Sequence, residues 1–391
     1  MLNSLSSIML VSGLVFMGTA PFVADYIVLA AGLVGLVLAV VTRDELLKAW
    51  TSRLLLLALV LVSITIPFVY HSEADLLPLA AFAPLLLVPG VAALLQRSPE
   101  WLSPYAFAMA CLAGAIAACL VGLAEYAAVE GARAGAGNNP IHYGGITTML
   151  GFMALTGVVA GRSPIRLIFL LGPVAALIAV LLSGSRGPLM AWAALAVVSA
   201  PLILWWNRRD RLLLGVIALA AIAAVAVLAT SSSNRAIGEL GTFITALTSG
   251  GMNSSDVVRS AMYQSAWEAL VDSPIVGQGF GQIMDFARAR YPDAGIGDLE
   301  NLHSDIGNFA AMAGLLGVIA YGLALLTPLV LLVPASARRN RPLILGSLML
   351  VVGYGVLGLT NAMFGVLPQT MLFVLLLGYL LALQRNDPTI S

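Results

Sequence analysis

Long apolar segments dominate this chain and limit what it can fold into. A helix needs about 20 mostly apolar residues to cross a bilayer. Twelve segments approach that length, at roughly 5–19, 23–41, 54–70, 76–95, 104–124, 144–160, 167–182, 189–206, 212–230, 305–333, 343–361 and 366–383. Only 10% of the residues are charged, against about 25% in soluble domains. The sequence therefore predicts an all-α polytopic membrane protein with about twelve transmembrane helices.

Basic residues divide unevenly between the two ends of these helices. With the N-terminus inside, thirteen Lys and Arg residues fall on the inner side and six on the outer side. Because short cytoplasmic loops collect Lys and Arg, we expect both termini in the cytoplasm and the long loop in the periplasm of a bacterial inner membrane. The first apolar run lacks a basic leader, so we expect it to be mature sequence.

The same pattern predicts three regions. Residues 1–230 hold the first nine helices, 231–304 form a periplasmic loop domain with short helices, and 305–391 hold three helices and a cytoplasmic tail. Pro78, Pro84 and Pro89 predict a kinked fourth helix. Residues 71–75, in the loop before it, are expected to form a solvated turn.

The loop domain carries most of the outer charge. A helix is expected over about 256–272, where Arg259, Tyr263 and Trp267 recur every four residues and share one face. That face suits sugar and phosphate contacts, but it is equally typical of amphipathic packing. In a second short helix, at about 282–291, Arg288 is a candidate ligand-binding residue, although Asp285 stands three residues before it and can pair with it.

Two candidate catalytic residues stand where membrane helices begin. Arg186 precedes the eighth span, whose N-terminal N–H groups favour an anion such as a phosphate, although the side chain can instead reach lipid phosphate. His303 precedes the tenth span, where the positive end of the helix dipole favours the neutral imidazole. A neutral imidazole can accept a proton from a hydroxyl or orient it.

Further substrate-binding candidates lie in other outer connections. Asn361 stands at the outer end of the eleventh span and can line a cavity at that end of the helices. The Gly-rich loop after the fifth span either meets a polar ligand or only bonds to its neighbours, and its candidates are Arg133, Asn139, His142 and Tyr143.

Several classes of function are disfavoured. No span has a charged residue near its middle, which argues against an ion-coupled transporter. The carboxylates of Asp298, Glu300 and Asp305 lack a metal-ligand spacing, so no metal and no cofactor are expected. The run from Gly277 to Gly281 lacks the βαβ setting of a nucleotide loop and predicts a tight turn. Zero net charge gives no indication of nucleic-acid binding.

These motifs, in this order, resemble a known family. They comprise Ser185-Arg186-Gly187, Arg259, the run Asp272-Ser-Pro-Ile-Val-Gly277, Gly281, His303-Ser304 and Gly314-Leu-Leu-Gly317. Together with the spans and the long loop, they resemble the O-antigen ligase and polymerase superfamily, and within it most closely the O-antigen ligases (WaaL). The resemblance covers residues 130–330 by motif and the rest by topology. The family often has Asn after the histidine, where this chain has Ser304.

The resemblance implies a metal-independent, inverting glycosyltransferase with a GT-C-like membrane fold. Such an enzyme would move a polysaccharide from undecaprenyl diphosphate to lipid A–core oligosaccharide, in contact with membrane lipid. Arg186 and Arg259 would bind the diphosphate, and His303 would activate or orient the acceptor hydroxyl. The alternatives are a polymerase of the same superfamily, a periplasmic protein O-oligosaccharyltransferase and, from a different class, a polysaccharide transporter.

Overall fold

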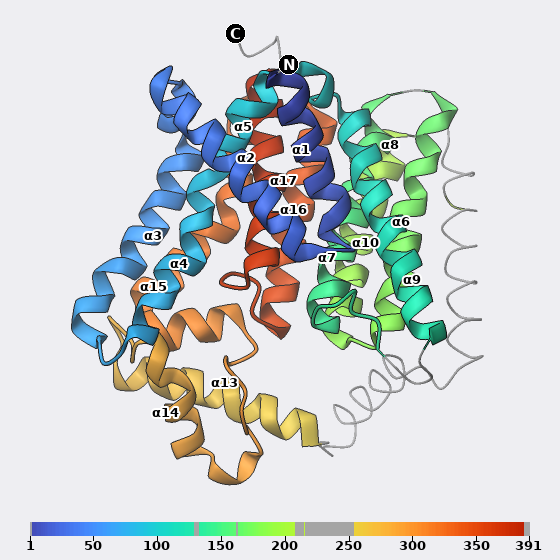
Figure 1. Ribbon diagram of the computed structural model, residues 1–391. Helices are drawn as coiled ribbons and strands as arrows, with labels where there is room; N and C mark the ends of the chain where they lie inside the picture. Colours follow the sequence, from blue (N-terminus) through green and yellow to red (C-terminus); the bar gives the residue numbers. More distant parts are fainter. Residues whose placement is uncertain (1, 129–132, 162, 208–214, 216–253, 387–391) are drawn as a thin grey trace.

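The computed structural model describes residues 2–128, 133–161, 163–207, 215 and 254–386, and every regular element within them is helical. Among these described residues, ten helices, some of them broken, are long and apolar enough to cross a membrane (Figure 1). They are α2 (Pro21–Val41), α3 (Trp50–Val69), the broken helix Glu73–Gln96, α6 (Pro104–Ala128), Pro140–Ala160 with α7 and α8, Pro164–Ser183 with α9, α10 (Arg186–Trp206), α15 (Asp305–Val330), α16 (Arg341–Thr360) and α17 (Leu367–Arg385). The predicted all-helical, multi-pass membrane fold is confirmed.

Two of the twelve expected spans do not appear among these ten. The first corresponds to α1 (Leu2–Met17), whose apolar part, Ile8–Met17, is shorter than the others. The ninth, at 212–230, and the beginning of the loop domain up to residue 253 lie outside the described residues, apart from Gly215.

Prolines break the fourth span as expected. It consists of α4 (Leu77–Phe82), the 3₁₀ turn η3 (Ala83–Leu87) and α5 (Val88–Gln96), each with a proline in its first turn. Proline lacks the N–H that a continuous helix requires and fits best at a helix start. The chain therefore restarts its helix twice within one span.

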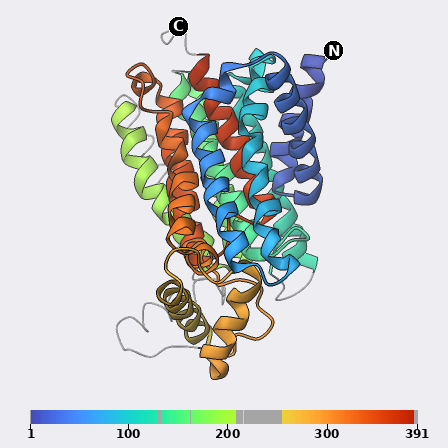
Figure 2. The same ribbon diagram turned by 90° about the vertical axis from the view of Figure 1, so that its left-hand side faces the viewer.

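The loop domain packs on one end of the helical bundle (Figures 1 and 2). Its helix α13 (Ser254–Asp272) runs across that end, and α14 (Ile283–Arg290) packs beside it. The beginning of α1 and the end of α17 lie at the opposite end of the bundle. These positions place the loop domain over the helix ends that carry the candidate residues.

A kink in α15 provides the attachment point for the loop domain. Gly314 leaves helical geometry there, with φ 60° and ψ −146°, so the carbonyls and N–H groups around it lose their intrahelical partners. The segment after α13 replaces them with four backbone hydrogen bonds. These are Gln278 N–H to Ala311 O (2.8 Å), Gly279 N–H to Met312 O (3.1 Å), Leu315 N–H to Pro274 O (2.8 Å) and Leu316 N–H to Ile275 O (3.4 Å).

Close backbone approach explains two glycines of this attachment. A Cβ on Gly314 would lie 2.5 Å from the carbonyl carbon of Ile275, and one on Gly277 would collide with the backbone at Ala313. Both glycines also have positive φ, which other residues adopt only with strain. The glycines singled out in the sequence thus join the loop domain to the bundle. The tight turn expected from Gly277 to Gly281 was wrong in position, because the turn lies at residues 274–276 and the 3₁₀ segment η7 (Phe280–Gln282) follows.

We expect Gly314→Ala to lower thermal stability markedly. The added Cβ has no space, and the conformation costs a non-glycine residue about 1–3 kcal/mol. The matched control is Gly322→Ala in the same helix, where a Cβ meets nothing within 4 Å and alanine should be neutral or slightly stabilising. Melting of the two purified variants in detergent measures the difference, and equal melting temperatures would contradict it.

Asp75 is a buried attachment residue rather than part of a solvated turn. Its side chain is 1% exposed, and its carboxylate accepts hydrogen bonds from the N–H groups of His71 (2.9 Å), Ser72 (3.1 Å) and Gly281 (2.8 Å). The expectation for residues 71–75 was therefore wrong at this residue. The carboxylate satisfies backbone donors that have no helical partner and ties the loop domain to the turn before α4.

Candidate active site

His303 stands at the junction between the loop domain and α15. Its backbone is left-handed, with φ 49°, and its N–H donates to Asn301 Oδ1 at 2.9 Å. The next residue, Ser304, caps α15 by accepting a hydrogen bond from the Gly307 N–H. Histidine is one of the few residues that adopt this conformation readily. Bonds made by the residues on both sides of His303 therefore fix its backbone at the start of α15.

Asn361 fixes the orientation of the His303 ring. Its Oδ1 lies 2.8 Å from His303 Nδ1, and because an amide oxygen only accepts, Nδ1 carries the hydrogen. This tautomer leaves a lone pair on Nε2. The chain just after Asn361 is fixed by Asp305, whose Oδ1 accepts from the N–H groups of Met363 (2.8 Å) and Phe364 (3.2 Å). The imidazole can accept a proton at Nε2 only.

His303 and Arg259 line one pocket between α13 and the segment before α15. The pocket has a volume of about 490 Å³ and is open to the outside. Its lining residues are Val258, Arg259, Met262, Gly295, Ile296, Asp298, Leu299 and His303. A base and a cation thus face the same space, which is large enough for a sugar and phosphate.

The environment favours neutral His303. Burial lowers the pKa of the imidazole, and the positive charge of Arg259 lowers it further, while the hydrogen bond to Asn361 acts in the opposite direction. The neutral form expected from the helix dipole thus has two further causes in the structure. Neutral Nε2 is the form that can take a proton from a hydroxyl.

Arg186 begins α10 next to this junction. Its side chain is 6% exposed, and Ser185 is the N-cap residue of the helix. The following residue, Gly187, packs against the end of α16, where a Cβ would collide with Thr360, the neighbour of Asn361. Arg186 and the positive end of the α10 dipole therefore lie beside the helix end that positions His303.

The Arg133 guanidinium supports this helix start. It donates to Ser183 O and to Ser185 Oγ, both at 2.8 Å. These bonds hold the turn between α9 and α10 on which Arg186 stands. The sequence left two roles open for Arg133, contact with a polar ligand or bonding to neighbouring residues. The described bonds of Arg133 are of the second kind.

Two of the other candidates in the connection before α7, Asn139 and Tyr143, bond to the backbone of the protein itself. Asn139 caps α7 (Pro140–Met153) by accepting from the Ile141 N–H, and the buried Tyr143 hydroxyl donates to Ala118 O at 2.7 Å. His142 is buried, close enough to His303 for their charges to interact. Gln369 Nε2 donates to the His142 carbonyl at 3.0 Å. Of these three candidates, His142 is the one whose charge interacts with that of a pocket residue, His303.

Arg288 holds the wall of the pocket. Its guanidinium donates to Gly297 O (2.9 Å), Leu299 O (3.0 Å) and Asp285 Oδ1 (3.0 Å). Two of these three acceptors are backbone carbonyls of the segment that lines the pocket. The pairing with Asp285 foreseen from the sequence is therefore present, and the structure adds a positioning role.

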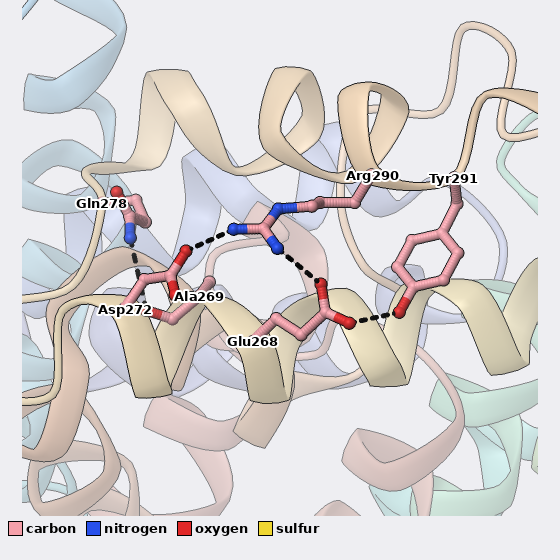
Figure 3. Close-up of polar contacts among 6 residues, drawn as sticks. All are labelled: Glu268, Ala269, Asp272, Gln278, Arg290 and Tyr291. Carbon is pink, nitrogen blue, oxygen red and sulfur yellow. Dashed lines mark hydrogen bonds and ion pairs between the residues drawn. The ribbon is translucent and has the colours of Figure 1, made fainter.

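Arg290 belongs to a separate network between α13 and the end of α14 (Figure 3). It bonds to Asp272 at 2.6 Å and lies 3.6 Å from Glu268, which in turn accepts from the Tyr291 hydroxyl at 2.6 Å. The network joins α13 to the end of α14. None of these side chains lines the pocket.

The aromatic residues that follow Arg259 point elsewhere. The Tyr263 hydroxyl donates to Leu359 O at 2.7 Å, and Trp267 is 66% exposed. Neither residue lines the pocket. The shared face of Arg259, Tyr263 and Trp267 is thus divided, because only its first member reaches the pocket.

No group of three His, Cys, Asp or Glu side chains gathers into a metal-binding arrangement among the described residues.

Comparison with known proteins adds one finding. Residues 171–322 match the family model described as O-Antigen ligase, a stretch that contains Arg186, Arg259, Arg288 and His303. The match is consistent with a member of the O-antigen ligase and polymerase superfamily, as the sequence motifs indicated. None of the curated proteins matches the chain significantly.

Proposed function

We propose that this chain, which carries the domain of the O-antigen ligase and polymerase superfamily, is an O-antigen ligase. It would be an inverting glycosyltransferase that moves a polysaccharide from undecaprenyl diphosphate to lipid A–core oligosaccharide. The observation that carries the proposal is the pairing of His303 and Arg259 in one open pocket, with the His303 proton held on Nδ1 by Asn361.

The proposed reaction is a single displacement at the anomeric carbon. A hydroxyl oxygen of the core sugar attacks C1 of the donor sugar while the bond from C1 to the phosphate oxygen breaks. The hydroxyl proton passes to His303 Nε2, and undecaprenyl diphosphate leaves with the bonding electrons. Attack from the face opposite the leaving group inverts the configuration at C1. Asn361 acts as a positioning residue, because its contact is with the imidazole.

The arginines would stabilise the leaving group. Negative charge develops on the diphosphate as its bond to C1 breaks, and cationic donors placed there lower the barrier. Arg259 faces the pocket, and Arg186 starts a helix whose N-terminus favours anions. The proposed enzyme thus needs no metal ion, and His142, beside His303, is a further candidate for contact with a sugar hydroxyl.

The proposed location is the bacterial inner membrane, with the loop domain in the periplasm and both termini in the cytoplasm. The distribution of basic residues supports it, since Lys48 precedes α3, Arg341 begins α16 and Arg385 ends α17, at helix ends far from α13. The three-region organisation, 1–230, 231–304 and 305–391, is part of the same proposal.

The direct test is deletion of the gene in its native bacterium, followed by gel separation of the envelope glycans. A ligase predicts undecorated lipid A–core while polymer accumulates on the carrier, with rescue by the natural chain and none by His303→Asn. Collapse of the polymer to single repeats would instead identify a polymerase. Normal glycans would overturn both readings and direct attention to glycosylation of periplasmic proteins.

The pH dependence of transfer should report the lowered pKa of His303. Only neutral His303 can accept the proton, so kcat/KM falls as pH drops through that pKa, which lies below the ordinary value of 6.5. In Arg259→Gln the neighbouring charge that lowers the pKa is gone, so the acid limb should move to higher pH. A limb at the same pH in both proteins would contradict this assignment.

A further inference from the structure

Helix α13 presents three different faces. One packs against the rest of the protein through Ala261, Met262, Ser265, Ala266 and Ala269, all buried. A second is polar, with Glu268 and Asp272 bonded to the end of α14 (Figure 3). The third is exposed and mostly apolar, with Tyr263 at 42%, Trp267 at 66% and Val271 at 58% beside the polar Gln264, and the stripe continues beyond the helix to Ile275 at 64%.

Both ends of this stripe meet exposed apolar residues of the membrane-spanning helices. At one end the Tyr263 hydroxyl bonds to the carbonyl of Leu359, an exposed residue in the last turn of α16. At the other end Ile275 accepts a hydrogen bond from Leu316, next to the exposed Leu315 of α15. Leu359 and Leu315 belong to membrane-spanning helices, and α15 packs against α16. The stripe therefore continues the exposed apolar surface of these two helices.

We propose that α13 is an interfacial helix that rests its Tyr263–Trp267–Val271 stripe on the bilayer, at the depth of the lipid headgroups. The helix runs across the end of the bundle, as an interfacial helix must (Figures 1 and 2). Tyrosine and tryptophan favour this depth because one end of each ring is apolar and the other is polar. The polar face with Glu268 and Asp272 turns to water.

This placement has a consequence for the pocket that rests on the proposed function. Arg259 lies one helical turn before Tyr263 on α13, and it lines the pocket. An α13 seated on the bilayer holds this guanidinium at the level of lipid phosphates. The diphosphate of a lipid-linked donor can then reach Arg259 while its chain stays in the membrane.

The test uses spin labels on the full-length protein in lipid nanodiscs. Labels are attached to Trp267→Cys, Val271→Cys and the control Asp285→Cys, whose natural side chain is 71% exposed on α14. The two native cysteines, Cys111 and Cys119, are buried. Collisions with dissolved oxygen report lipid, and collisions with a water-soluble nickel chelate report solvent. We expect a several-fold higher oxygen-to-nickel ratio at 267 and 271 than at 285.

Two results would overturn the proposal. Labels at 267 and 271 that match the label at 285 would place the stripe in water. Labels shielded from both reagents would show that protein covers it, for instance a second copy of the chain. Val271→Cys replaces a smaller side chain than Trp267→Cys, so it keeps the test decisive if the tryptophan variant fails to fold. None of these readings depends on transfer activity, so they separate this proposal from the enzymatic one.

Discussion

Replacing His303 with alanine or asparagine is expected to lower kcat by about 10²–10⁴, the usual contribution of a general base. Among the described residues of the pocket lining, the Asp298 carboxylate is the one other group that can accept a proton. His303→Asn is the sharper variant, because asparagine tolerates the left-handed backbone that alanine does not. Transfer from a lipid-linked donor, measured with purified protein, gives the loss directly.

The control for this prediction is His71→Ala. His71 is exposed, and its ring Nδ1 lies 2.7 Å from the Val69 carbonyl, outside the pocket. This variant removes the same imidazole at the same end of the bundle and should keep near-normal activity. Comparable activity in His303→Asn and His71→Ala, with both proteins folded, would exclude a chemical role for His303.

Removal of the Arg259 charge should have the second-largest effect. Arg259→Gln is expected to reduce kcat/KM by about 10²–10³, the cost of losing one donor to a developing negative charge. Arg290→Gln is the matched control, because it removes the same charge from the same domain but only breaks exposed ion pairs worth about 0–1 kcal/mol. Steady-state transfer rates of the two variants measure the contrast.

Whether Arg259→Gln changes kcat or KM distinguishes two roles for Arg259. A residue that stabilises the leaving group lowers kcat, whereas one that only binds the ground-state donor raises KM. We expect the loss in kcat. Equal effects of Arg259→Gln and Arg290→Gln would contradict a specific role for Arg259 in stabilising the leaving group.

The sequence predicts the elements of the fold because their signals are local. Apolar length identifies the spans, prolines identify the breaks in the span Glu73–Gln96, and helix starts place Arg186 and His303 at one end of the bundle. The side on which a residue lies follows from counting spans. Candidate residues on different helices could thus be assigned to one end without any knowledge of their contacts.

Contacts across long separations could not be predicted in this way. The bond between His303 and Asn361 joins residues 58 positions apart, and the bond from Asp75 to Gly281 spans 206. Arg288 bonds to backbone carbonyls, and because every residue has a carbonyl, the sequence does not indicate which ones it contacts. The kink at Gly314 is visible only once Ile275 is seen to pack against it.

Reconstituted transfer tests the central claim most directly. Purified chain in nanodiscs is mixed with an undecaprenyl diphosphate-linked polysaccharide and lipid A–core oligosaccharide, and both the glycan products and the released carrier are measured. We expect polysaccharide joined to lipid A–core, one undecaprenyl diphosphate released for each transfer, and loss of both products in His303→Asn. Longer polysaccharide still attached to the carrier, with lipid A–core unchanged, would contradict the ligase assignment.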